Sequence, residues 1–77
     1  MLERGLYRHY KGTIYEVLGI ARHSESLEEL VLYREAGNAG FSGFWVRPVT
    51  MFQEMVYVDG VTRPRFEKLA QAPGMNL

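Results

Sequence analysis

The sequence contains no cysteine, so neither disulfides nor thiolate-bound zinc can supplement its core. A chain of 77 residues forms one small domain. Such a domain buries only about 60% of the surface that its unfolded form exposes, which leaves little room for an enclosed active site. Apolar packing must therefore stabilise the fold, and 47% of the residues are hydrophobic. We expect a single domain over 1–77, with a core over about 5–69 and a flexible tail over 70–77.

Net charge is also lacking, because nine basic and nine acidic residues cancel. A neutral chain does not exert the long-range attraction that drives non-specific nucleic-acid binding. Long hydrophobic runs are missing too. The longest nearly apolar stretch, residues 17–21, is far shorter than the roughly 18 residues that cross a membrane, and residues 1–5 contain no apolar export segment. We expect a cytoplasmic location and no membrane partner.

Aromatic, cationic and strand-forming residues dominate the first half of the chain. Lys11 fits poorly in a two-residue turn that needs positive φ, so residues 10–12 are expected to form a three-residue hairpin loop with Gly12 in the left-handed bulge position. This loop sets the strand register. One face then carries Tyr7, His9, Thr13, Tyr15 and Val17, and the other carries Leu6, Arg8, Ile14, Glu16 and Leu18.

The rest of the sequence predicts short strands separated by turns. Residues 13–23 form a long strand that Gly19 bends, as in small barrels whose strands are shared by two sheets. Further strands are expected at 30–35, 44–47 and 55–58, with capping-box turns at 26–29 and 50–53, an Asp59-Gly60 turn and a short return through Val61 and Thr62. One helical or 3₁₀ turn is expected to bury Met51 and Phe52. Five strands with such a short turn, taken as 3₁₀, predict an all-β fold, a small SH3-like barrel.

Several segments resemble one bacterial family. They are Gly5-Leu6-Tyr7-Arg8-His9-Tyr10-Lys11-Gly12, Tyr15 through Ser24, Val31 through Arg34, Trp45-Val46-Arg47-Pro48, Met51-Phe52 and Pro64-Arg65-Phe66. Together they are similar to the domain of unknown function 1653, over Gly5 to about Leu69. The resemblance implies a small β domain of the SH3 type in short bacterial proteins. It implies no activity, cofactor or catalytic residue.

Aromatic rings beside arginines are the best candidate binding site. The candidate residues are Tyr7, Arg8, His9, Tyr33, Arg34, Trp45 and Arg47. Such sets stack bases and bind peptides, although most rings in so small a domain must also form its core. We expect a non-catalytic binding module for single-stranded nucleic acid, with rings on bases and arginines on phosphate, or for a protein partner. Self-association through Phe41, Phe44 and Trp45 is a further possibility.

The two histidines do not predict a metal site or a cofactor. His9 is expected opposite Thr13, and ten residues of straight strand from there to His23 would span about 33 Å. No nearby carboxylate has ligand spacing. Ser24 is interpreted as a turn residue and the glycines of 37–43 as a hairpin loop, because no helix follows them to complete a phosphate loop. No catalytic residue is assigned. The alternative is a small hydrolase or nucleotide-handling accessory with His9 or His23 as general base.

Overall fold

A computed structural model describes residues 2–37 and 43–71 of the chain. The elements are β1 (Gly5–His9), β2 (Ile14–Arg22), β3 (Glu29–Glu35), β4 (Trp45–Pro48), α1 (Val49–Phe52), β5 (Met55–Val58), β6 (Val61–Pro64) and β7 (Phe66–Gln71). The all-β class predicted from the sequence is confirmed, and the described residues form seven strands in place of the expected five or so.

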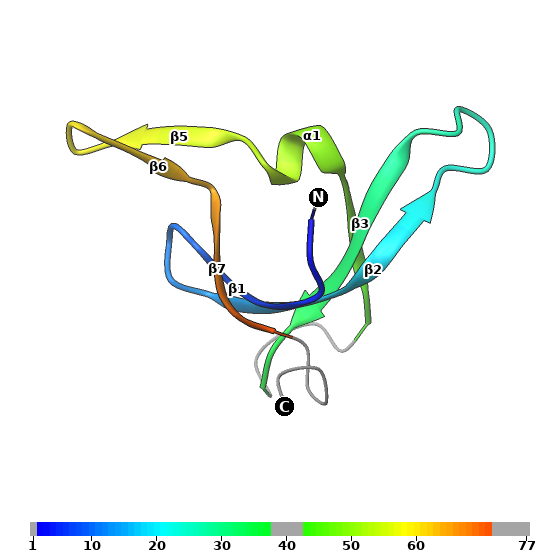
Figure 1. Cartoon of the computed structure of the whole chain (residues 1–77), viewed down its shortest axis with the longest axis horizontal. Coiled ribbons are helices and arrows are strands. Elements are labelled where there is room, and N and C mark those ends of the chain that lie inside the picture. Colours follow the sequence, from blue (N-terminus) through cyan, green and yellow to red (C-terminus); the bar gives the residue numbers. More distant parts are fainter. Residues whose placement is uncertain (1, 38–42, 72–77) are drawn as a thin grey trace.

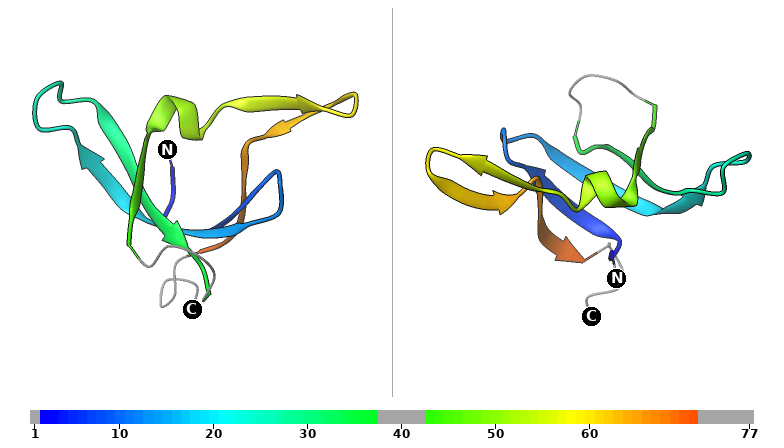
Figure 2. Two further views of the ribbon diagram at one scale, coloured as in Figure 1. Left: turned by 180° about the vertical axis from the view of Figure 1, so that it is seen from behind. Right: turned by 90° about the horizontal axis from the view of Figure 1, so that it is seen from above.

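The strands form one antiparallel five-stranded sheet, in the order β4-β3-β2-β1-β7, and a separate hairpin of β5 and β6. The five-stranded sheet curls around the centre of the molecule, and the β5–β6 hairpin, called the arm below, projects to one side (Figures 1 and 2). In the described part of the chain, β4 and β7 are not paired with each other. The closed SH3-like barrel therefore stays a prediction.

The opening hairpin has the predicted register. Tyr7 lies opposite Tyr15, and His9 and Thr13 flank the three-residue loop, with the His9 amide donating to the Thr13 carbonyl at 2.8 Å. Gly12 has a φ of 114°, a region that a residue with a Cβ rarely adopts. Its amide donates to the His9 carbonyl at 2.7 Å. The loop chemistry therefore determines which side chains of β1 and β2 face the core.

Gly19 marks an irregularity in β2, as expected. The register against β3 shifts between Val17 and Gly19, which leaves one extra residue in β2. The capping-box turn expected at residues 26–29 is not helical. Its serine is used differently: the Ser26 hydroxyl accepts from the Glu28 amide at 3.2 Å, and Leu27 adopts a φ of 65°. A local side-chain bond thus competes with helix formation.

The second helical turn is present but shifted. It is one turn of α-helix, not a 3₁₀ turn, and it begins after Pro48, with no side-chain cap from Thr50. Phe52 is buried, at 1% exposure, whereas Met51 is 45% exposed, so the expectation that both residues pack is wrong for Met51. A single turn can direct only one of two adjacent side chains into the core.

The core is a cluster of aromatic rings on the concave side of the sheet. Its buried members are Tyr7, Val17, Val31, Tyr33, Phe52 and Phe66. Phe52 and Phe66 stack in parallel, with ring centroids 4.0 Å apart, and Tyr33 meets both rings edge-on at 5.5 and 5.8 Å. The Tyr7 hydroxyl donates to the Glu3 carbonyl at 2.6 Å, so its burial leaves no unpaired polar group.

Sequence analysis missed β7. Phe66 follows Arg65, whose carbonyl accepts from the Tyr10 amide at 2.9 Å, and β7 then pairs with β1 from His9 to Gly5. The strand continues to Gln71, beyond the expected limit of the core at residue 69. Residues 72–77 of the predicted tail lie outside the described residues, as do residues 38–42 of the glycine-rich loop.

Replacing the stacked ring is expected to destabilise the fold far more than replacing its neighbour. Phe52→Ala should lower the free energy of unfolding by about 3–5 kcal/mol, because it removes a buried ring and leaves a cavity. Met51→Ala, on the exposed side of the same turn, should cost about 0.5 kcal/mol or less. Urea denaturation followed by circular dichroism measures both values, with Phe52→Leu as the milder variant. Equal losses for Phe52→Ala and Met51→Ala would contradict this core assignment.

Two glycines should respond differently to the same substitution. Gly12→Ala is expected to cost about 1–2 kcal/mol, because alanine is strained at positive φ although space is open around the position. Gly19→Ala meets open space and has no positive φ, so stability should stay within about 0.5 kcal/mol or rise. Thermal unfolding of the two variants in parallel tests the loop geometry. A tolerated Gly12→Ala would show that the hairpin uses another turn.

Candidate functional site

The residues predicted to form a binding surface do not all come together. Tyr7 and Tyr33 are both buried, so their rings belong to the core, and the prediction that they stack on a ligand needs correction. The geometry gives the reason: β1 and β3 each present these positions to the concave side of the sheet. A buried ring has no face left for a base to cover.

Trp45 and Arg47 lie together at the β4 edge of the sheet. With Tyr15 and Tyr33 they line a recess of about 190 Å³. The Arg47 Nε donates to the Tyr33 hydroxyl at 3.3 Å, and its guanidinium lies 5.6 Å from the centre of the Phe66 ring. Arg47 is thus engaged within the protein, while Trp45 is 45% exposed.

Arg34 and Arg8 belong to two other places on the surface. Arg34 makes two bonds to the Glu16 carboxylate, at 2.9 and 3.0 Å. Arg8 reaches Glu67 of β7 at 3.4 Å, and both side chains are at least half exposed. Because exposed pairs hold each other weakly, Arg8 remains accessible to an anionic ligand.

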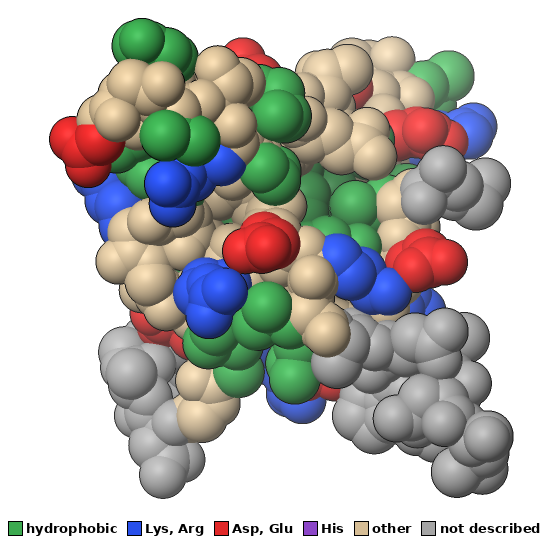
Figure 3. All heavy atoms as spheres, turned by 60° about the vertical axis from the view of Figure 1, so that its left-hand side comes forward, with side chains coloured by type: hydrophobic (Ala, Val, Ile, Leu, Met, Phe, Trp, Pro, Cys, Tyr) green, Lys and Arg blue, Asp and Glu red, His purple; other side chains and the backbone are tan. Residues whose placement is uncertain are grey.

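A larger groove, of about 420 Å³, separates the tip of the β1–β2 hairpin from the arm. We call it the turn–arm groove; it is lined by Arg8, His9, Tyr10, Val61, Arg63, Pro64 and Glu67. One wall is the end of β1 with its loop, and the other is β6. Figure 3, which brings this side of the molecule forward, shows Lys and Arg side chains close to hydrophobic ones.

Tyr10 lies among positive charges in this groove. The Lys11 ammonium lies 5.8 Å and the Arg65 guanidinium 5.9 Å from the centre of its ring, both within the range of cation–π attraction. Arg65 also pairs with Glu54 at 3.1 Å, which fixes the base of the arm. The Arg65 Nε is buried without a hydrogen-bond partner in the described residues.

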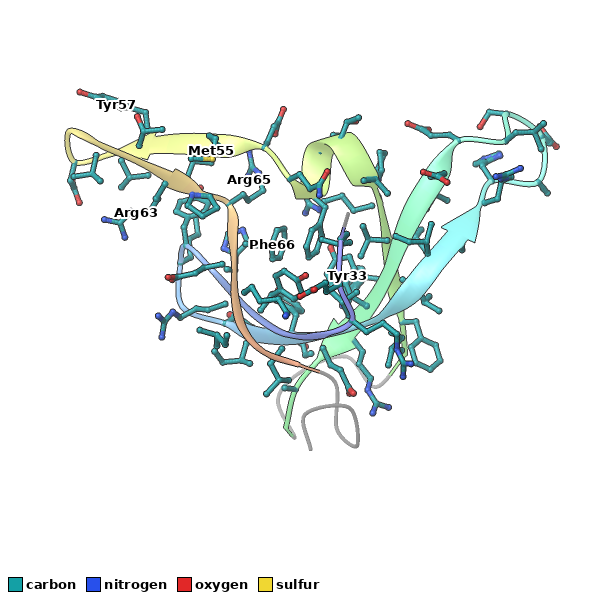
Figure 4. All side chains as sticks on the ribbon, in the orientation of Figure 1. Tyr33, Met55, Tyr57, Arg63, Arg65 and Phe66 are labelled. Atoms are coloured by element: carbon teal, nitrogen blue, oxygen red, sulfur yellow. The ribbon has the colours of Figure 1, made fainter. Side chains whose placement is uncertain are left out.

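Arg63 places a positive charge on the second wall of the turn–arm groove, which is β6. It lies opposite Val56 in the arm, so both side chains project from the same face of the hairpin. Figure 4 shows Arg63 and Tyr57 on opposite sides of the arm, with Arg63 on the side of the β1–β2 loop. The side chain of Arg63 is exposed, and the described residues provide no ion pair for it.

His9 packs between rings at the floor of the groove. Its ring lies 4.5 Å from Tyr10 and 5.0 Å from Phe66, and its Nδ1 accepts from the Lys11 amide at 3.1 Å. Burial lowers the pKa of His9 below the ordinary 6.5, and the nearby Arg65, Arg47 and Lys11 lower it further. His9 is therefore neutral near pH 7, with its proton on Nε2.

The second histidine lies elsewhere. His23 follows β2, and its Nδ1 accepts from the Glu25 and Ser26 amides at 3.1 and 3.3 Å. His9 thus packs against aromatic rings, whereas His23 lies just beyond the end of a strand. Over residues 2–37 and 43–71, no three His, Cys, Asp or Glu side chains come together in a way that could hold a metal ion. The same residues include no helix long and apolar enough to cross a membrane.

Sequence reasoning missed the groove's second wall. Arg63 and Pro64 followed the expected return strand and were given no role, and Tyr10 was placed in the loop without a function. The available signal was the alternation of Arg63, Pro64, Arg65 and Phe66, which has the period of two that a strand shows. Only the fold brings β6 opposite the β1–β2 loop.

The fold and the groove together define a small antiparallel β protein with an open, arginine- and tyrosine-lined cleft. Residues 5–68 match a family described as a protein of unknown function, DUF1653, and the chain belongs to this family. The resemblance noted from the sequence is thereby confirmed. A crystal structure of a DUF1653 protein from Bordetella bronchiseptica is similar, with 31% identity, 92% of this chain and 91% of that chain covered, and a TM-score of 0.83. No functionally curated protein matches the chain.

The His9 pKa leads to a prediction about pH. A histidine whose folded-state pKa is depressed contributes stability above its unfolded pKa and loses it as pH falls through the folded value. Wild-type protein should therefore lose more unfolding free energy between pH 7.5 and pH 5 than His9→Asn, which can still accept from the Lys11 amide but does not titrate. Urea titrations at both pH values measure the difference. Parallel pH profiles for the two proteins would refute the assignment.

Proposed function

We propose that this protein is a non-catalytic module that binds single-stranded nucleic acid in the turn–arm groove. The observation that carries the proposal is Arg63, an exposed guanidinium on one wall of a groove whose other wall presents the Tyr10 ring and His9. An arginine beside a partly exposed ring suits a nucleotide, because the phosphate can pair with the guanidinium and the base can stack on the ring.

The charge around the groove supports an anionic ligand. Arg8 and Arg63 line it, and Lys11 lies over Tyr10 at its rim. Glu67 also lines the groove and opposes these charges, so the groove carries more positive than negative side chains. The net charge of the whole chain is zero, so attraction acts only locally and binding should be moderate and strongly reduced by salt.

The geometry favours binding over general-base catalysis. A base needs a free lone pair aimed at its substrate. The lone pair of His9 Nδ1 accepts from the Lys11 amide, and Nε2 carries the proton of the neutral ring, so the free nitrogen is a donor. His9 thus fits a role in hydrogen bonding a base edge or phosphate better than the alternative role in a small hydrolase.

Two substitutions with the same change in charge test the proposal. Arg63→Ala should weaken binding of a mixed-sequence single-stranded 12-mer by about three- to tenfold and reduce the salt slope by about one, because one phosphate contact is lost. Arg34→Ala, whose arginine is held by Glu16 away from the groove, should leave affinity within about twofold. Fluorescence anisotropy with labelled RNA and DNA at low salt measures both.

The contribution of the Tyr10 ring to binding is tested in the same assay. Tyr10→Ala should cost about 1–3 kcal/mol of binding free energy, whereas Tyr10→Phe keeps the stacking face and should bind nearly as wild type. Glu67→Gln should strengthen binding, because it removes the carboxylate of the groove. Equal loss for Arg63→Ala and Arg34→Ala, or no binding of either nucleic acid at low salt, would refute the proposed function.

A further inference from the structure

The outer edge of β5 is short, but its residues carry no charge or proline that would prevent pairing. In the described part of the chain, β5 pairs with β6 on one side and with no strand on the other. Its four residues, Met55–Val58, include neither a charge nor a proline, two of the devices that block pairing at an edge. Met55 and Tyr57 are 57% and 75% exposed. Figures 1 and 2 show this edge facing away from the sheet.

The turn at the tip of the arm determines which backbone groups are free. Asp59 and Gly60 both have positive φ, and Val58 lies opposite Val61, as in a two-residue hairpin loop. The residues that flank such a loop form a hydrogen-bonded pair, and the pairs then alternate along the ladder. The amide and carbonyl groups of Met55 and Tyr57 therefore point outward from β5.

The other edge of the arm differs. On β6 the outward groups are those of Thr62 and Pro64, which lie opposite Tyr57 and Met55. Pro64 has no N–H, so this edge lacks a donor. Arg63 adds a charge to the same strand. Only the β5 edge of the arm offers a complete ladder.

We propose that two copies of this chain associate by antiparallel pairing of their β5 edges around a twofold axis. An antiparallel pair of identical strands is self-complementary, as a closed dimer requires. With Val56 opposite Val56 of the second copy, Met55 lies opposite Tyr57 of the second copy and Tyr57 opposite its Met55. The outward amide and carbonyl groups of the two β5 strands then form four hydrogen bonds. In each of the two cross-strand pairs, the Met55 thioether of one copy lies against the Tyr57 ring of the other.

Other registers that also place the outward backbone groups of the two strands opposite each other match the two edges less well. If Tyr57 lay opposite Tyr57 of the second copy, Met55 would lie opposite Asp59, outside the strand. The Val56-centred register also keeps the two Glu54 carboxylates four residues apart along the ladder, about 13 Å, so like charges are not placed opposite each other. A second copy therefore satisfies the outward backbone groups of the edge without placing like charges opposite each other.

The small area of the contact limits the expected affinity of the dimer. One four-residue strand from each copy covers much less than the about 800 Å² per partner of a stable interface. The dimer should therefore have a dissociation constant on the order of 0.1 mM and dissociate on dilution. The outward face of the arm, with Met55 and Tyr57, is opposite the face that carries Arg63, so the two copies keep their grooves open.

Sedimentation equilibrium from about 10 µM to 1 mM tests the proposal, over the range in which such a weak dimer forms. Wild-type protein should shift from monomer to dimer. Met55→Lys with Tyr57→Lys places lysine opposite lysine and should weaken the dimer at least about tenfold. Met55→Glu with Tyr57→Lys places glutamate opposite lysine and should restore it. Ser24→Lys with Thr50→Lys adds the same two charges at exposed positions outside the arm and should leave the dimer unchanged.

Amide hydrogen exchange of the wild-type protein tests the same contact without any substitution. The amide protons of Met55 and Tyr57 should exchange more slowly as concentration rises, while that of Thr62 should not. A monomer at every concentration would overturn the proposal. A dimer that resists the paired lysines would also overturn it and would favour the surface at Phe44 and Trp45. Failure of the glutamate–lysine variant to restore association would refute the Val56-centred register.

Discussion

The stacked pair of Phe52 and Phe66 is the contact on which the rest of the structure depends. Its rings come from α1 and from the start of β7, which are separated by the whole arm, and they lie 4.0 Å apart in parallel planes. Tyr33 meets both rings and Tyr7 meets Phe52. The stack therefore fills the concave side of the curled sheet and anchors both ends of the segment between them. A protein without disulfides has few other means to do so.

This anchoring explains why the arm projects as it does. The Arg65 amide donates to the Glu54 carbonyl at 2.9 Å, and their side chains form an ion pair, so the arm is closed at its base beside the stack. Its two faces and its edge are then free for different tasks. We assign the face with Arg63 to nucleic acid and the outer edge of β5 to a second copy. Both proposed surfaces depend on the position of the arm, which the packing of Phe52 on Phe66 determines.

Local chemistry explains why some elements could be predicted and others could not. The opening hairpin was predicted in register because Gly12 and Lys11 restrict the loop, and the bend in β2 because glycine weakens a strand. The turn at residues 26–29 was wrong, because the Ser26 hydroxyl can cap a helix or bond its own chain, and the sequence does not distinguish the two. Strand β7 was missed, since its pairing with β1 joins residues about sixty positions apart.

The candidate site also has features that could be predicted from the sequence and features that could not. Composition and patterning by themselves determined an all-β domain, because the period of two and the turn residues act over a few positions. Tertiary structure alone decided that Tyr7 and Tyr33 are core residues, that Arg34 is held by Glu16, and that Tyr10 and Arg63 share a groove. The physical reason is that burial and proximity depend on the Phe52–Phe66 stack, a long-range contact that no local pattern encodes.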